Sequence, residues 1–554
     1  MKQLKRPVSL FAALVAWVGI AAAMHPLAAA TFEFACDKPG GVYSLGEKAT
    51  ITVAAFETNK VPLASGNVKW RLDNFGDATI SEGTFDASKG ANTFSVSGTM
   101  NEPGFMRLDV AELDEQGNSG KTQFFGVAYD PYNIKPGAEC PADFNDFWAA
   151  AVRKYDEAVT APIKVTKIDD DPSEERDLYE LEIPTIDGRS VWGYLSEPKD
   201  LSKGPFPVLV SVPGAGPSTW GAEGDGKTIR MVVNVHYYRP LRGEAKHSER
   251  NEANQKAEDK AWAKRYPVKH VRYTTTGIAS SREEYYYYGV LLGINRAVDW
   301  LAARPEVDRR RFRYWGGSQG GGFGLWLCGL NRNFTRAVVG VPALTDLLGS
   351  RQGGRESGWP RLVEGQLDEN KAAAERNAPY FCGVNFARNI SIPIRVEVGS
   401  ADTVCPPMAG FSAFNVMPSK DKDILIGLGQ GHSMLPEISK KLNIWLRQDA
   451  LDIQRQIDDM HAAGGGRVTV PAGRYEVGPI HLKSNVELHF EDGAELLFTD
   501  DINAYLPPVE TARGGVECLR AKFERDISLS DPAMLSGLVV SNLTVAVVES
   551  EKPQ

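Results

Sequence analysis

Apolar and polar residues alternate in short segments of the N-terminal part of the chain, most clearly at 49–54, 67–72 and 92–97. Alternation with a period of two is typical of strands that bury one face. Turns rich in Gly, Asn and Asp separate the segments. Short alternating strands over about 100 residues indicate an all-β sandwich across residues 31–130. No group of residues with catalytic chemistry occurs in it.

The pattern becomes mixed between residues 131 and 449. Short runs rich in β-branched residues, at 207–212 and 231–235, are typical of strands buried in a parallel sheet. A helical pattern is clearest at about 286–303. Strands that take turns with helices predict an α/β domain. The β-rich region before it has the size and turn chemistry of an immunoglobulin-like sandwich.

Residues 1–30 have the three parts of a secretory signal peptide. Lys2, Lys5 and Arg6 precede an uncharged apolar run at 8–23, and small residues end the segment at Ala30. We predict cleavage after Ala30 and a secreted or periplasmic protein without a membrane span. An uncleaved anchor is the alternative, although the run is shorter than the roughly 20 residues that cross a bilayer.

Composition narrows the classes of function. Hydrophobic residues make up 42% of the 554 residues and charged residues 24%, which describes a packed globular protein. A net charge of −9 without a long basic block argues against a nucleic-acid partner. The six cysteines form no Cys-x-x-Cys pair and no cluster with histidine, which argues against a structural zinc site and leaves disulfide pairing open.

The strongest chemical signal is Gly-Gly-Ser-Gln-Gly at residues 316–320, a match to the pattern Gly-x-Ser-x-Gly. A strand is predicted at 312–315 and a helix from about 323 onward. A sharp turn between a strand and a helix, with glycines on both sides, exposes the hydroxyl of Ser318. A glycine-rich turn with an inert serine is the plain alternative, which the flanking elements disfavour.

A nucleophilic serine needs a histidine as base and a carboxylate that orients the histidine. In this type of fold the acid follows the serine and the histidine follows the acid. His432 is the only histidine after Ser318 within the α/β region, and it follows a predicted strand. Asp402 follows the preceding strand and is the expected acid. Glu397, inside that strand, is the alternative.

Two backbone N–H groups should bind the negative oxygen that forms during acyl transfer. Gln319, directly after the serine, supplies one of them. The other is expected from Ala215, because Gly214 and Gly216 let the backbone of this loop come close.

Four motifs in a fixed order carry a resemblance to a known family. They are Pro-Ala-Asp-Phe-Asn-Asp-Phe-Trp at 141–148, Arg-Ala-Val-Asp-Trp-Leu at 296–301, Gly-Gly-Ser-Gln-Gly-Gly at 316–321 and Asp-Thr-Val-Cys-Pro-Pro at 402–407. Residues 131–449 resemble the acetyl xylan esterase/cephalosporin-C deacetylase family of α/β-hydrolases. The resemblance implies removal of acetyl groups from sugar hydroxyls without a cofactor or metal, with Ser318, Asp402 and His432 as the triad.

Two motifs depart from that family. Its usual Arg-Gly-Gln is Arg-Gly-Glu at 242–244, and its usual His-Gly-Tyr is Pro-Gly-Ala at 213–215. These departures bear on substrate preference more than on chemistry. Trp220, Tyr237 and Tyr238 are the expected residues for stacking on sugar rings, since an aromatic face suits C–H surfaces. Ordinary packing of these three residues is an equal alternative.

The last region carries a second resemblance. A short amphipathic helix predicted at 451–463 precedes Gly-Gly-Gly-Arg-Val-Thr-Val-Pro-Ala-Gly at 464–473 and Gly-Pro-Ile-His-Leu-Lys-Ser at 478–484. Residues 453–517 resemble the start of a polygalacturonase-type right-handed β-helix. The catalytic aspartates of that family come from motifs further downstream. We therefore expect a partial β-helix-like segment over 450–554 without glycosidase activity.

One motif points to an activity that we reject. Residues 221–228 match the phosphate-loop pattern Gly-x-x-x-x-Gly-Lys-Thr. That loop works only ahead of a helix N-terminus, whereas a strand is predicted to follow. The carboxylates of Glu223 and Asp225 would also repel phosphate. Nucleotide binding is not expected.

The sequence thus predicts a secreted carbohydrate O-acetylesterase built from an immunoglobulin-like sandwich at 31–130, an α/β-hydrolase domain at 131–449 and a partial β-helix-like segment at 450–554. Its expected partner is an acetylated polysaccharide or oligosaccharide. The family resemblance points to xylan, whereas the C-terminal resemblance points to pectin. An esterase for non-acetyl esters and a non-catalytic polysaccharide-binding protein on a hydrolase scaffold are the other hypotheses.

Overall fold

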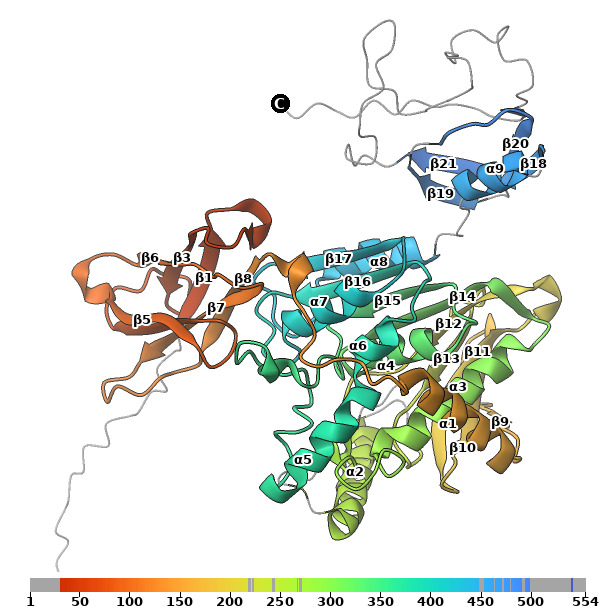
Figure 1. The fold of residues 1–554 in the computed structure, drawn as a ribbon, viewed down its shortest axis with the longest axis horizontal. Coiled ribbons are helices and arrows are strands. Elements are labelled where there is room, and N and C mark those ends of the chain that lie inside the picture. Colours follow the sequence, from red (N-terminus) through yellow and green to blue (C-terminus); the bar gives the residue numbers. More distant parts are fainter. Residues whose placement is uncertain are drawn as a thin grey trace, which may run out of the picture.

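A computed structural model of the chain describes residues 30–217, 221, 224–241, 245–266, 268, 272–447, 453–462, 464–470, 473–478, 480–490, 494–498 and 540–541 (Figure 1). Residues 1–29 of the predicted signal peptide, Trp220 and the motif at 242–244 lie outside the described residues. None of the helices in the described part is long and apolar enough to cross a membrane. The five cysteines of that part are free thiols.

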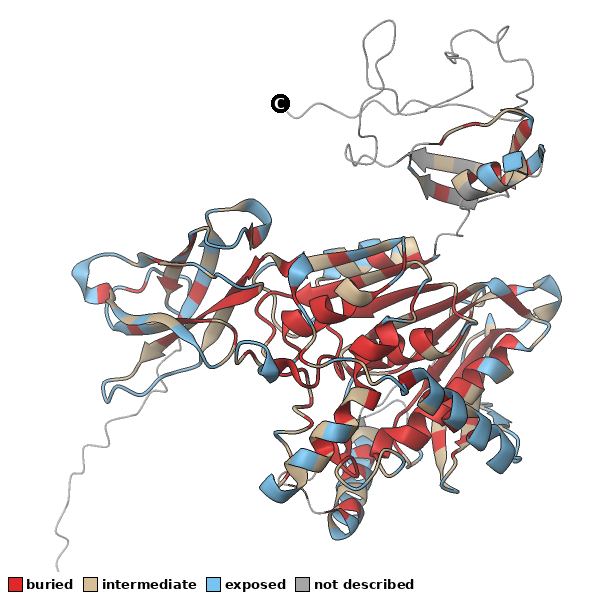
Figure 2. Cartoon of the chain, viewed as in Figure 1, coloured by how far each residue is buried: buried red, intermediate tan, exposed pale blue. Residues whose placement is uncertain are grey.

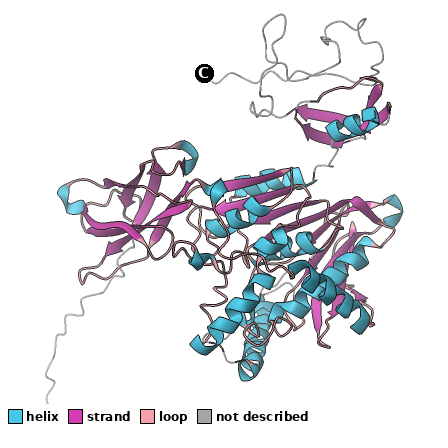
Figure 3. Cartoon of the chain, viewed as in Figure 1, coloured by secondary structure: helices cyan, strands magenta, loops and turns pink. Residues whose placement is uncertain are grey.

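Two β-sheets form the N-terminal region (Figure 3). One has the strand order β1-β3-β6 and the other the order β2-β8-β7-β4-β5. Side chains of both sheets, among them Ile51, Val53, Val68 and Val127, are buried in one core, as the period of two predicts. The strands are β1 (Thr31–Cys36), β2 (Val42–Tyr43), β3 (Ala49–Phe56), β4 (Asn67–Asp73), β5 (Thr79–Asp86), β6 (Thr93–Gly98), β7 (Gly104–Leu113) and β8 (Gln123–Tyr129).

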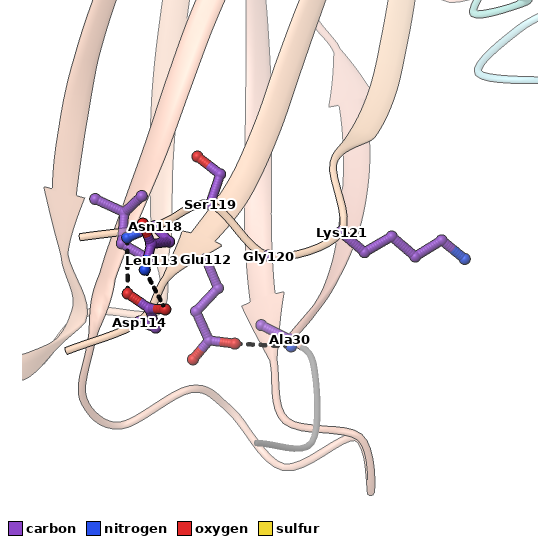
Figure 4. Close-up of a pocket in the computed structure, with 8 residues that line it drawn as sticks. All are labelled: Ala30, Glu112, Leu113, Asp114, Asn118, Ser119, Gly120 and Lys121. Carbon is purple, nitrogen blue, oxygen red and sulfur yellow. Dashed lines mark hydrogen bonds between the residues drawn. The ribbon is translucent and has the colours of Figure 1, made fainter. Parts of the chain in front are cut away.

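Ala30 is part of this sandwich, although the predicted cleavage would remove it. It is 4% exposed, its N–H donates to Glu112 Oε2 at 2.9 Å, and its carbonyl accepts from Gln123 Nε2 at 3.0 Å. Figure 4 shows Ala30 beside Glu112 in a pocket of the sandwich that Asp114 and Lys121 also line.

A nine-stranded sheet of order β17-β16-β15-β14-β12-β13-β11-β10-β9 forms the centre of the larger domain. Its neighbours from β17 to β13 run parallel, and β11, β10 and β9 join antiparallel. The strands are β9 (Lys164–Lys167), β10 (Arg176–Pro184), β11 (Ser190–Pro198), β12 (Phe206–Ser211), β13 (Ile229–Val233), β14 (Val307–Gly317), β15 (Arg336–Gly340), β16 (Ile394–Gly399) and β17 (Lys422–Gly427). Strand β13 directly follows the phosphate-loop match, where such a loop would need a helix.

Helices cover both faces of the central strands β12 to β16, which are mostly buried, whereas the edge strand β9 is exposed (Figure 2). Ala337 and Val339 of β15 face one core, and Val338 packs on the other side with Leu442 and Leu446 of α8. Burial on both faces explains why the strands are continuous apolar runs. The helices are α1 (Phe144–Ala158), α2 (Ala245–Arg265), α3 (Tyr286–Ala302), α4 (Gln319–Leu330), α5 (Asp368–Asn377), α6 (Gly383–Ala387), α7 (Pro407–Val416) and α8 (Pro436–Arg447).

Helix α4 begins at Gln319, earlier than the predicted start at about 323. Its first turn contains three consecutive glycines, which are poor helix formers and hide the helix from a sequence pattern. Packing requires them there. A β-carbon on Gly320 would lie 2.0 Å from the carbonyl oxygen of Val212, and one on Gly321 would lie 2.5 Å from that of Gly340.

The sandwich and the larger domain share one hydrophobic core. Phe75, Phe105 and Ala128 of the sandwich belong to the same cluster of buried residues as the sheet and helices of the larger domain. The ring centre of Phe105 lies 5.7 Å from that of Phe411 in α7. The two regions therefore pack as one body.

The C-terminal region has a core of its own, which includes Ile457, Val468 and Leu488. Strand β18 pairs in parallel with β20, and β19 pairs in parallel with β21. In the first pair Val468 lies opposite Leu488, and in the second Tyr475 lies opposite Leu496. The two strands of each pair are therefore separated by nearly the same number of residues. Stacked coils of a repeat structure have such a regular spacing. The elements are α9 (Ile453–Ala462), β18 (Gly466–Val470), β19 (Gly473–Val477), β20 (Val486–Phe490), β21 (Ala494–Phe498) and β22 (Val540–Ser541). A β-helix stays a prediction for this region.

Candidate active site

Three parallel strands bring Ser318, Asp402 and His432 to one edge of the sheet. Ser318 follows β14, Asp402 follows β16 and His432 follows β17, and the carboxyl ends of parallel strands meet at the same edge. Ser318 Oγ lies 2.9 Å from His432 Nε2, and His432 Nδ1 lies 2.8 Å from Asp402 Oδ2. The three side chains thus form a hydrogen-bonded line.

The backbone of Ser318 is strained, with φ of 58° and ψ of −122°. Surrounding backbone holds it there, since its N–H donates to Gly340 and its carbonyl accepts from Ala343, both at 3.0 Å. A β-carbon on Gly316 would lie 2.5 Å from the carbonyl oxygen of Gly320, so the turn closes only with glycine. Such strain is stored where surrounding contacts over-determine a residue, often at functional sites.

Asp402, and not Glu397, is the carboxylate beside the histidine. It is fully buried, and its Oδ1 accepts the N–H groups of Val404 at 2.8 Å and Cys405 at 2.9 Å. Its Oδ2 is left for His432. Glu397 accepts the N–H of Leu435 at 2.7 Å instead, and burial raises the pKa of its carboxyl to about 7. Glu397 therefore supports the segment that follows His432.

The two segments that carry the backbone groups predicted to bind an oxyanion are in contact. Gln319 opens helix α4, and N–H groups in the first turn of a helix have no intrahelical partner. The loop that contains Ala215 follows β12. The side chain of Gln319 reaches this loop and donates to the carbonyls of Pro213 at 3.3 Å and Gly214 at 3.4 Å.

Two tyrosines that the sequence did not single out complete this contact. Gln319 Oε1 accepts the hydroxyls of Tyr273 at 2.9 Å and Tyr287 at 2.6 Å. The N–H of Gly216 donates to the Tyr273 oxygen at 3.4 Å, which closes a ring of hydrogen bonds back to the loop. For Tyr287, a tyrosine inside the apolar pattern of helix α3 was the available signal, because a buried hydroxyl needs a partner.

The two described aromatic residues predicted to stack on sugar are engaged in packing. Tyr237 donates its hydroxyl to the carbonyl of Tyr286, and the guanidinium of Arg189 lies 3.4 Å from its ring centre. Tyr238 stacks on His236 with ring centres 4.9 Å apart. These contacts favour the packing alternative. Burial lowers the pKa of His236 to about 4, so it is neutral where its Nε2 lies 3.2 Å from the carbonyl of Gly216.

Comparison with known proteins decides the family. The model of the acetyl xylan esterase (AXE1) family matches residues 130–449, more than half of the chain. The chain belongs to the acetyl xylan esterase family. It is a serine-type carboxylic ester hydrolase with an α/β-hydrolase fold, and membership supports acetylesterase activity on carbohydrate.

Three proteins named as acetyl esterases or acetyl xylan esterases are similar to this chain. Acetyl esterase Axe7A of Xylanibacter ruminicola is 30% identical over 366 residues, which cover 63% of this chain and 76% of the relative. The acetyl xylan esterase from Paenibacillus sp. R4 is 23% identical with a TM-score of 0.46, covering 57% of this chain and 97% of the other. Acetyl xylan esterase 1 from Thermoanaerobacterium sp. JW/SL YS485 is 18% identical with a TM-score of 0.45, covering 57% and 96%.

Proposed function

We propose that this esterase is exported and removes acetyl groups from an acetylated polysaccharide through an acyl-enzyme on Ser318. The observation that carries the proposal is the hydrogen-bonded line Ser318–His432–Asp402 within the span that matches the family. Ser318 Oγ attacks the acetyl carbonyl carbon while His432 Nε2 takes its proton. The same proton then passes to the sugar oxygen as its bond to the acetyl carbon breaks.

Water completes the cycle. It attacks the acetyl-serine carbonyl, gives a proton to His432, and acetate leaves as that proton returns to Ser318 Oγ. Asp402 holds the Nδ1–H of the histidine throughout and stabilises the imidazolium. The N–H groups of Gln319 and Ala215 bind the oxygen that becomes negative in both steps. The scheme needs neither cofactor nor metal.

Xylan is the substrate that we propose first, because it follows from the family to which the chain belongs. Acetylated pectin is the second candidate. It is favoured by the parallel strand pairs of the C-terminal region, whose spacing fits the predicted polygalacturonase-like coils.

The test measures acetate released from acetylated xylan and acetylated pectin side by side. We expect acetate release from at least one of these substrates. In Ser318→Ala the rate should fall by about a thousandfold or more, because the nucleophile is missing. Asp402→Asn should cost less than Ser318→Ala, since the carboxylate orients and does not transfer a proton. Retained activity in Ser318→Ala would refute the mechanism, and a larger loss in Glu397→Gln than in Asp402→Asn would refute the choice of acid.

A further inference from the structure

We propose that the N-terminal sandwich is a positioning element of the active site, which fixes the acid loop (residues 400–406) and the histidine loop (residues 428–435). The proposal rests on the proposed function, because it takes Asp402 and His432 as members of the triad. Two independent sets of contacts carry it. One is apolar and starts from strand β8, and the other is a chain of ion pairs that starts from strand β7.

The apolar contacts meet both loops where the loops bind each other. The N–H of Gly429 in the histidine loop donates to Ser400 Oγ in the acid loop at 2.7 Å. Gly126 of β8 lies directly on that point, since a β-carbon there would be 1.8 Å from the Ser400 carbonyl oxygen. The ring of the adjacent Phe125 would lie 3.0 Å from a β-carbon on Gly429. A movement of β8 therefore displaces both loops.

The ion-pair chain begins at Arg107, whose side chain is only 8% exposed. Within the sandwich it pairs with Asp73 at 3.0 Å and with Asp109 at 2.8 Å. Across the boundary it pairs with Glu356 at 3.1 Å. The second oxygen of Glu356 accepts from Arg361 at 2.7 Å.

Arg361 connects the series of ion pairs to the turn that binds the carboxylate of Asp402. Its guanidinium donates to the carbonyls of Thr403 at 3.0 Å and Val404 at 2.5 Å, the two residues that follow Asp402. The N–H of Val404 in turn donates to Asp402 Oδ1 at 2.8 Å. Arg361 thus grips the short turn that orients Asp402. A planar guanidinium with two fixed donors is suited to holding two carbonyls at once.

Backbone bonds keep the middle of this chain in register with the sandwich. The N–H of Glu356 donates to the carbonyl of Phe75 at 3.0 Å, and the N–H of Asp77 donates to the carbonyl of Gly354 at 3.0 Å. Glu356 is therefore placed by the β4–β5 turn as well as by Arg107. Because a displacement of about 1 Å in a catalytic group can cost around a hundredfold in rate, such support bears directly on catalysis.

Glu356→Gln in the full chain tests the ion-pair chain. The variant keeps the shape of the side chain and removes its charge. We expect kcat for p-nitrophenyl acetate to fall about tenfold while KM changes less than about twofold, because the ion pairs of Arg107, Glu356 and Arg361 do not take part in substrate binding. The matched control is Glu375→Gln, which breaks a nearby pair with Arg351 that does not touch the acid loop. It should leave kcat unchanged.

A double-mutant cycle separates positioning from general support. In an Asp402→Asn background, Glu356→Gln should cost less than about twofold, since it acts through Asp402. A further tenfold loss in that background would overturn the proposal, and so would an unchanged kcat in the single variant. If Glu356→Gln does not fold, Arg361→Lys takes its place in the same cycle with the same criteria. Failure of the proposed function is distinguishable, because Asp402→Asn alone would then leave kcat intact.

Discussion

Phe105 of the sandwich and Leu488 of the C-terminal region are both buried, but in different kinds of core. Phe105 packs on Phe411 within the core of the catalytic domain. In the part of the chain that the structure describes, Leu488 packs in a cluster of C-terminal residues. Sequence patterns predicted a separate region on each side of the α/β-hydrolase domain and did not indicate how either is attached. Among the described residues, the N-terminal region shares the core of the enzyme and the C-terminal region has a separate core, a difference that a boundary drawn along the sequence does not reveal.

Removal of residues 31–130 should have the largest effect on this contrast. It would uncover the side of the catalytic domain that packs on Phe75, Phe105 and Ala128 and release the acid and histidine loops. We expect an insoluble product or a loss of kcat of about a hundredfold or more. Circular dichroism and p-nitrophenyl acetate hydrolysis check this. A folded product with activity near that of the full chain would make the sandwich an appendage too.

The loop of Ala215 offers a comparison with the loops that the sandwich contacts, because residues of the catalytic domain itself bind this loop. Tyr273→Phe removes the hydroxyl that links Gly216 to Gln319, and we expect kcat to fall about tenfold at nearly constant KM. Tyr285→Phe is the matched control. That tyrosine is also buried, and its hydroxyl donates to the carbonyl of Thr274 at 2.8 Å rather than to Gln319. Equal losses in the two variants would argue against a specific role for the ring of hydrogen bonds.

Stability against pH tests whether the sandwich and the catalytic domain unfold together. Burial raises the pKa of Asp109 in the sandwich to about 6 and that of Glu397 in the catalytic domain to about 7. Both groups bind protons more tightly in the folded state, so stability should fall as pH rises from about 4 to 7. We expect one shared thermal transition whose midpoint falls by a few degrees across that range.

Glu397→Gln removes one of the carboxyl groups whose pKa is raised by burial and should weaken this pH dependence. Glu375→Gln, at a half-exposed ion pair, should keep it. Two transitions with different pH dependence, one for each region, would show that the shared core does not couple them.

Removal of the C-terminal region should have the smallest effect. A chain that ends at Asp449 loses a cluster that packs on itself, so esterase activity should stay within about twofold of the full chain. It should also resist protease better, because parallel coils are stable only in stacks of about three or more. Activity assays and limited trypsin digestion check both points. Loss of esterase folding would mean that the C-terminal region is structural.

Much of the catalytic domain follows from local patterns. The spacing of Gly-x-Ser-x-Gly, Asp402 and His432 after successive strands predicts their meeting, because parallel topology brings strand ends together. The start of helix α4 could not be predicted from the local sequence pattern. Its glycines oppose a helix locally, and only contacts with Val212 and Gly340, distant in sequence, require them.

The attachment of the sandwich was beyond local reasoning for a similar reason. Arg107 lies in an alternating strand where a charge predicts an exposed position, yet it is buried because Glu356 and three aspartate oxygens surround it. No property of residues 31–130 alone indicates a partner as distant in sequence as Glu356. The four tyrosines at 285–288 indicate buried hydroxyl groups that need hydrogen-bond partners, but the sequence does not identify Gln319 as the acceptor for Tyr287.

Trapping the acyl-enzyme tests the central claim most directly. The full chain is mixed with p-nitrophenyl acetate, quenched in acid within the turnover time, digested and analysed by mass spectrometry. The account predicts an acetyl group on the peptide that contains Ser318, and none on the same peptide in Ser318→Ala. Turnover with acetate release but without label on Ser318, or with the label on another residue, would contradict the account.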